Sequence, residues 1–186
     1  MVREVRNDTH GNKVTKMSLN HKPIIHLLAM SFILAPLGCE EVELALPSDS
    51  EAGAHYASSS DLTVRVSGNV VELTVDQPIR QVRRGGSLWA KVGPYIYLFS
   101  DQTEALLREY PGLSGVRVIT RTGGNNAEVA RAFLHRDSLN ELTWRRARNI
   151  AGKARVEGTR RPSLLEDLVE WGQDHTEFGY NKEFVS

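Results

Sequence analysis

Three things are scarce in this 186-residue sequence: cysteine, long apolar runs and net charge. The single cysteine, Cys39, cannot form an internal disulfide, so no such cross-link stabilises the fold. The longest apolar run has about sixteen residues, fewer than the ~20 that a bilayer-spanning helix needs. The 23 Lys and Arg residues match 23 Asp and Glu residues, and this balance does not favour nucleic acid as a partner. The spacings of phosphate-binding loops and of the G-x-S-x-G nucleophile motif are also missing.

The apolar run lies at residues 23–38 and has the organisation of a secretory signal peptide. Basic residues precede it, the small residue Gly38 ends it, and Met17 is a natural translation start. We therefore predict that residues 1–38 are a leader, with residues 1–16 upstream of the true start. The leader holds five basic and two acidic side chains, so the remaining chain is acidic by about three charges.

The leader is followed at once by the only cysteine. Residues 17–39 resemble the signal of bacterial lipoproteins, in which a peptidase cuts before a cysteine that is then acylated. The resemblance implies export, cleavage after Gly38, and lipidation of Cys39 as an anchor in the lipid bilayer. Glu40 after the cysteine implies, in enteric bacteria, sorting to the outer membrane facing the periplasm. A plain cleaved signal, or a buried N-terminal helix in a cytosolic protein, is the alternative interpretation.

Residues 39–61 are rich in acidic and small polar residues and show no hydrophobic period. This composition predicts a flexible tether between the membrane and a folded domain. The remaining residues, 62–186, are enough for one hydrophobic core, so we predict a single domain.

The order of predicted elements places this domain in the α+β class. Alternation and turn residues predict two hairpins and two further strands, at 62–66 with 71–75, 79–82 with 88–92, 95–99, and 115–121. Four capping signatures, each with a Glu three residues after the capping residue, predict helices at 102–110, 126–136, 139–155 and 164–175. The economical architecture is a mixed, mainly antiparallel sheet of four to six strands with about four helices packed on it.

Two groups of residues are candidates for chemistry. Gly123, Gly124, Asn125 and Asn126 follow a predicted strand and open a predicted helix, whose free N–H groups attract a small anion. The alternative for these residues is a tight turn with a cap. His135 with Asp137, and His175 with Glu177, each pair an imidazole with a carboxylate, as acid–base chemistry requires. Residues two apart on a helix point in different directions, so the alternative is that each histidine caps a helix end. No metal site or cofactor is predicted.

The C-terminal third segregates its charges. A basic contact face is predicted on the helix that begins near residue 139, formed by Arg145, Arg146, Arg148, Lys153 and Arg155. The next helix is acidic, so the two either neutralise one another as a hairpin or leave the basic face for anionic lipid or an acidic partner. The aromatic tail, 175–185, is predicted to lie across the domain as an extended arm; the alternative is a docking segment for another protein.

Taken together, the sequence predicts an envelope lipoprotein whose domain binds or scaffolds another envelope protein without catalysis. The alternatives are a membrane-anchored hydrolase or transferase that uses the two histidine–carboxylate pairs, and a binder of small anions at residues 123–126. Convergence of the two pairs in one cleft would favour the enzyme.

Overall fold

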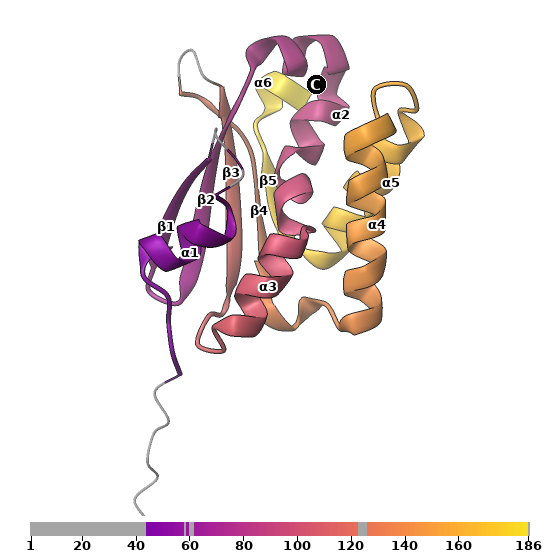
Figure 1. Cartoon of the computed structure of the whole chain (residues 1–186). Coiled ribbons are helices and arrows are strands. Elements are labelled where there is room, and N and C mark those ends of the chain that lie inside the picture. Colours follow the sequence, from indigo (N-terminus) through magenta and orange to yellow (C-terminus); the bar gives the residue numbers. More distant parts are fainter. Residues whose placement is uncertain (1–43, 58, 60–61, 123–125, 186) are drawn as a thin grey trace, which may run out of the picture. The chain divides into compact units, whose positions relative to one another are not determined.

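Five strands form one sheet, and their order across the sheet repeats their order along the chain (Figure 1). They are β1 (Leu62–Ser67), β2 (Val70–Gln77), β3 (Gly115–Thr122), β4 (Glu128–His135) and β5 (Glu177–Tyr180). The neighbours β2 and β3 run parallel, and the other three pairings are antiparallel. The structure is a computed structural model that describes residues 44–57, 59, 62–122 and 126–185. The predicted α+β class, with a mixed and mainly antiparallel sheet, is confirmed.

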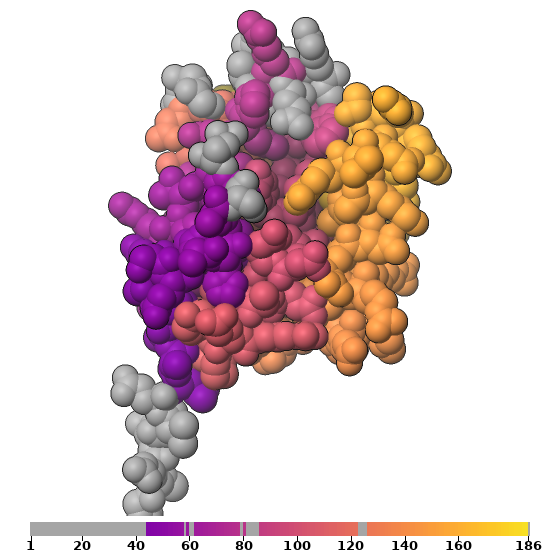
Figure 2. Space-filling model, viewed as in Figure 1, coloured from indigo at the N-terminus to yellow at the C-terminus, as the bar shows by residue number. Residues whose placement is uncertain are grey.

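The helices of the described residues pack on one face of this sheet (Figure 1). They are α1 (Asp49–His55), α2 (Ile79–Leu98), α3 (Asp101–Glu109), α4 (Glu141–Glu157), α5 (Ser163–His175) and the short α6 (Lys182–Val185), with one 3₁₀ turn at Arg136–Ser138. Helices α2 and α3 make the crossover that a parallel pair such as β2 and β3 requires. In the space-filling view, α3 shows between α1 on one flank and the α4–α5 pair on the other (Figure 2).

The hydrophobic core lies between the sheet and α2. Strand residues alternate between the two faces, and the helix-facing positions are fully buried in the three central strands. These positions, with the α2 residues that face them, include Val71, Leu73, Val116, Val118 and Leu134 against Val92, Tyr95 and Leu98. Burying each aliphatic side chain of this size contributes about 1.5–3 kcal/mol, so this layer dominates the stability of the fold.

The segment from residue 79 to 98 is a helix, so the predicted second hairpin and the strand at 95–99 are wrong. Gly86 has a φ of 64° and divides α2 into two helical segments, so the glycine pair marks a kink rather than a hairpin turn. The side chains of Trp89, Val92 and Tyr95, three residues apart, are buried together in the core. Aromatic and β-branched residues suggested a strand here, but burial of a helical face outweighs that local preference.

Residues 128–135 form β4, so the predicted helix at 126–136 is also wrong. Ala130, Ala132 and Leu134 are buried while Arg131 and His135 between and after them are exposed, which is the period of a strand. The Asn-x-x-Glu signature before this segment was therefore a coincidence of composition. The other predicted helices are present as α3, α4 and α5.

The predicted tether, residues 39–61, is wrong over its second half, because residues 49–56 are folded onto the domain. Ser48 caps α1 and forms a capping box with Glu51, and Ala52 and Tyr56 are buried in the core. The Tyr56 hydroxyl lies 2.8 Å from the Thr103 hydroxyl of α3. The folded body therefore begins before residue 49 instead of at residue 62.

The C-terminal tail does lie across the domain, as predicted. β5 pairs antiparallel with β4, and the Tyr180 hydroxyl lies 2.6 Å from the Tyr95 hydroxyl of α2. After it, Phe184 and Val185 of α6 pack against Ala90 of α2. The tail thus adds the edge strand β5 beside β4 and covers part of α2.

Candidate functional site: the open face of the sheet

The face of the sheet that points away from the helices carries a row of functional side chains from all five strands. The registers place Arg65, Glu72, Arg117, Phe133 and Glu177 opposite one another, in that order from β1 to β5. These are the positions between the buried ones, so the alternation that builds the core also builds this row. The row therefore combines two cations, two carboxylates and an aromatic ring.

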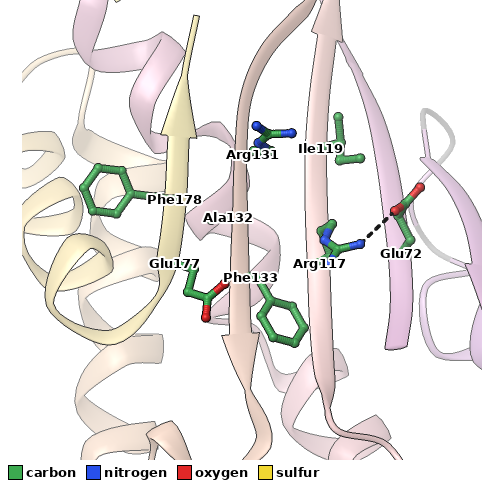
Figure 3. A pocket seen from close by; sticks show the side chains of 8 residues that line it. All are labelled: Glu72, Arg117, Ile119, Arg131, Ala132, Phe133, Glu177 and Phe178. Carbon is green, nitrogen blue, oxygen red and sulfur yellow. Dashed lines mark hydrogen bonds and ion pairs between the residues drawn. The ribbon is translucent and has the colours of Figure 1, made fainter. Parts of the chain in front are cut away.

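Arg117 is the centre of the row. Its Nη1 donates to Glu72 Oε2 at 3.5 Å, drawn as a dashed line in Figure 3, and its guanidinium lies 5.4 Å from the centre of the Phe133 ring. The side chain is 41% exposed, so this ion pair contributes at most about 1 kcal/mol to stability. The main consequence of these contacts is positional. The Glu72 carboxylate and the Phe133 ring together hold the guanidinium over the middle strand.

A hollow of about 450 Å³ lies on this face beside Arg117. Figure 3 shows that its walls come from β2, β3, β4 and β5. The next row supplies Ile119 and Arg131, which are register partners on β3 and β4. Ile119 is only 8% exposed although no described helix covers this face, so the hollow has an apolar floor within a charged rim. The Arg131 side chain lies over Gly179 of β5. A Cβ added at Gly179 would be 3.2 Å from the Arg131 Nε atom.

Arginine supplies most of the cations of the whole chain and also those of the sheet. The cations of the five strands, apart from His135, are all arginines, at Arg65, Arg117, Arg121 and Arg131, and the strands contain no lysine. Arginine and aromatic residues are enriched in protein–protein interfaces, whereas lysine is depleted there. Arginine also makes two-point contacts to carboxylates that lysine cannot make.

The structure brings together only half of the predicted acid–base residues. His135 Nε2 lies 2.9 Å from Glu177 Oε1, across β4 and β5, beside the hollow. Both side chains are more than half exposed. His175 is at the end of α5, where its ring stacks on Trp171 and its Nδ1 lies 2.8 Å from the Trp171 carbonyl oxygen. Asp137 lies in the 3₁₀ turn and shares no contact with either histidine. The four residues therefore do not form one catalytic cleft.

The predicted anion site loses its physical basis. Asn126 precedes β4 rather than a helix, so no helix N-terminus forms after it; its φ is 55° and its N–H donates to the Thr122 carbonyl at 3.0 Å. Gly123, Gly124 and Asn125 lie outside the described residues. Among the residues that the structure does describe, no cluster of three His, Cys, Asp or Glu side chains is arranged to hold a metal ion.

Only part of the predicted basic contact face is free of contacts with other helices. Arg148 forms ion pairs with Asp101 and Glu104 of α3, and Arg155 Nη2 donates to the Ile96 carbonyl at 3.1 Å, so both tie α4 to the interior helices. Hydrogen bonding to Asp101 raises the pKa of Arg148, which remains charged at any ordinary pH. The other three residues, Arg145, Arg146 and Lys153, are exposed.

Helices α4 and α5 pack as the predicted hairpin, but their charges do not pair. Within the described residues no ion pair joins the two helices. The Arg146 guanidinium of α4 instead lies over the Trp171 ring of α5, 4.6 Å from its centre. The acidic side chains of α5 therefore remain solvated.

Cys39 and Gly38 lie outside the described residues, so the structure says nothing about the leader. In the described part of the chain, no helix is both long and apolar enough to cross a bilayer. Comparison with protein-family models, curated proteins and solved structures finds no match.

Sequence reasoning did not find the open face. The signal was present in residues 128–135, where Arg131, Phe133 and His135 alternate with apolar residues. The helix prediction for this segment hid the alternation. The partner residues Glu72 and Arg117 were on strands that were predicted correctly, but their meeting depends on the parallel pairing of β2 with β3.

Proposed function

We propose that this chain is a non-enzymatic binding domain of the bacterial cell envelope, and that the open face of the sheet is its contact surface for a partner protein. The observation that carries the proposal is the arginine and phenylalanine surface around the hollow at Arg117. Arginine is one of the side chains that most often make single-residue contributions of about 2 kcal/mol or more to protein–protein binding, and phenylalanine is enriched in such interfaces. The apolar floor at Ile119 offers a place for one aliphatic side chain of the partner.

The charges of the open face indicate the kind of partner. The central row carries two arginines and two carboxylates, so a complementary surface must also carry both signs rather than a single one. A uniformly charged partner, such as nucleic acid, would meet repulsion at Glu72 and Glu177. A folded protein with mixed charges meets no such penalty.

The envelope location is proposed from the lipoprotein-like signal at residues 17–39. Acylation of Cys39 would hold the folded body at a membrane surface, within reach of other envelope proteins. The test is palmitate labelling of the full chain in a bacterial host, compared with Cys39→Ser. We expect the label and the membrane-bound fraction to be lost together in this variant. A Cys39→Ser chain that stays on membranes would refute the anchor.

The contact surface is tested by site-specific photo-crosslinking of the full chain in the same host. A photoreactive amino acid at Arg131 probes the open face, and the same group at Asn149, exposed on α4, is the matched control. We expect a discrete crosslinked product from position 131 only. The product should decrease at least fivefold when Arg117→Glu is added, because the substitution places a third carboxylate between Glu72 and Phe133. Equal products at both positions, or no product at position 131, would contradict the proposal.

A further inference from the structure

The N-terminal chain joins the folded body at the turn between α3 and β3. Pro47 is buried, and the Ala45 carbonyl accepts a hydrogen bond of 3.3 Å from the Gly112 N–H in this turn. A Cβ at residue 112 would lie 2.6 Å from the Leu44 carbonyl oxygen, so the missing side chain lets the entering segment pack closely on the turn. The point at which the chain enters the domain is therefore fixed by contacts.

Exposed leucines lie at this end of the molecule. Among the large apolar side chains exposed in the described part of the chain, Leu44 and Leu46 belong to the entering segment and Leu142 to the first turn of α4. Figure 1 shows the entering segment, the end of α3 and the start of α4 at the same end of the body, the lower one in the view. The 3₁₀ turn before α4 ties these parts together, because the Arg136 guanidinium donates to two carbonyls of the α3–β3 turn.

The chain itself limits the distance between this end and an acyl anchor at Cys39. Five residue steps separate Cys39 from Leu44, and even a fully extended chain covers no more than about 18 Å in that number. Helix α4 alone is about 25 Å long. An acylated Cys39 therefore holds the entry end of the domain beside the bilayer surface.

The charges at this end are balanced. The last two residues of α3, the first two of the 3₁₀ turn and the first five of α4 carry three cations and three carboxylates, at Arg108, Arg136, Arg145, Glu109, Asp137 and Glu141. The linking residues add Glu40, Glu41 and Glu43, so attraction to anionic headgroups is not the driving force. The favourable contribution is the removal of the leucine side chains from water, which a neutral lipid surface also provides.

We propose that the entry end of the domain rests on a lipid bilayer, with Leu44, Leu46 and Leu142 in contact with lipid. This proposal rests on the proposed function, because it requires the acyl anchor. β1 and β4 end at the entry end, and β2 and β3 begin there (Figure 1). The strands then stand upright on the membrane, and the open face points sideways, toward a neighbouring envelope protein.

The experiment measures which end of α4 lies next to lipid. Acylation uses the only native thiol, so Leu142→Cys and Val156→Cys each give the mature chain a single site for a fluorophore. Both side chains are exposed, and the two positions lie on the same side of α4, about 21 Å apart along the helix axis. Each labelled chain is purified in its acylated form and returned to phosphatidylcholine vesicles, which carry a nitroxide quencher near the headgroup end of the acyl chains.

We expect the quencher to reduce the fluorescence at position 142 at least about threefold more than at position 156, because only the start of α4 reaches lipid. Equal quenching at the two positions would place α4 flat on the bilayer, and no quenching at position 142 would leave the leucines for a protein partner. Either result overturns the proposal.

Palmitate labelling of the same chains separates this proposal from the anchor itself. A palmitate label without quenching at position 142 overturns only the orientation. A chain that takes no palmitate and stays off the vesicles overturns the anchor as well.

Discussion

Gly172 of α5 lies directly against the ring of Tyr95, and this contact sets how closely α5 approaches α2. A Cβ at residue 172 would be 2.5 Å from two ring carbons of Tyr95. The ring cannot easily move, because it stacks on Phe99 and its hydroxyl is paired with that of Tyr180. We therefore expect Gly172→Ala to lower the free energy of unfolding by about 1–3 kcal/mol.

The matched control is Gly152→Ala on α4. No atom lies within 4 Å of a Cβ at residue 152, so the substitution should raise stability by about 0.5–1 kcal/mol through helix propensity alone. Urea unfolding of both variants measures whether each substitution raises or lowers the free energy of unfolding. Equal effects of the two substitutions would show that the close packing at Tyr95 is not a constraint.

Two buried tyrosines make the fold sensitive to alkali. Burial raises the pKa of Tyr56 and of Tyr95 above the ordinary value of 10.0. A folded-state pKa above the unfolded one means that stability is complete below pH 10 and falls as the pH rises beyond it. Above pH 10, each of these tyrosines should lower the free energy of unfolding by about 1.4 kcal/mol per pH unit.

The measurement is denaturant unfolding from pH 8 to 11, repeated with Tyr95→Phe. We expect the slope above pH 10 to become shallower in the variant, because one of the tyrosines with a raised pKa has been removed. An unchanged slope would mean that Tyr95 ionises in the folded chain as it does in the unfolded chain.

At the scale of elements, α1 is part of the core rather than of a linker. Tyr56 is 3% exposed and its hydroxyl is paired with Thr103, so truncation leaves a cavity and an unpaired hydroxyl. Tyr56→Ala should lower the unfolding free energy by about 3–5 kcal/mol. Ala57→Ser, at the exposed neighbour, should change it by less than about 0.5 kcal/mol. Comparable melting temperatures of the two variants would restore the tether interpretation.

The tail is a second element whose contribution is measurable. Deleting residues 178–186 removes most of β5 and all of α6, leaves the edge of β4 unpaired and exposes Ala90. We expect a lower melting temperature, by about 2–4 °C for each kcal/mol lost in a domain of this size. Lys182→Ser, at an exposed side chain of α6, is the control and should have little effect.

The elements that sequence reasoning recovered are those in which local pattern and tertiary burial agree. The β1–β2 hairpin has clean alternation around a turn, and α4 has Trp144, Ala147 and Ala151 at helical spacing and in the core. α2 and β4 were predicted wrongly, because a glycine pair and a capping signature are short local signals. Whether such a segment becomes a helix or a strand depends on its contacts with distant segments.

At the scale of the whole molecule, the two faces of the sheet have different roles. One face is covered by helices and supplies the core, and the other exposes arginines and a hollow at Arg117. This division could not be predicted from the sequence, because it requires the strand order and the parallel pairing of β2 with β3. The hollow at Arg117 was not predicted, since it is lined by residues from four strands.

The agreement between strand order in the chain and strand order in the sheet has a consequence for synthesis. A chain that emerges from its N-terminus can add each new strand to an edge that already exists, so no earlier strand must be displaced. The longest interval between successive strands is between β4 and β5, while α4 and α5 emerge, and the interval between β2 and β3 is nearly as long. During the first of these intervals in the chain the edge of β2 is open, and during the second the edge of β4 is open until β5 is made. The sheet is therefore complete only when the four residues of β5 have been made.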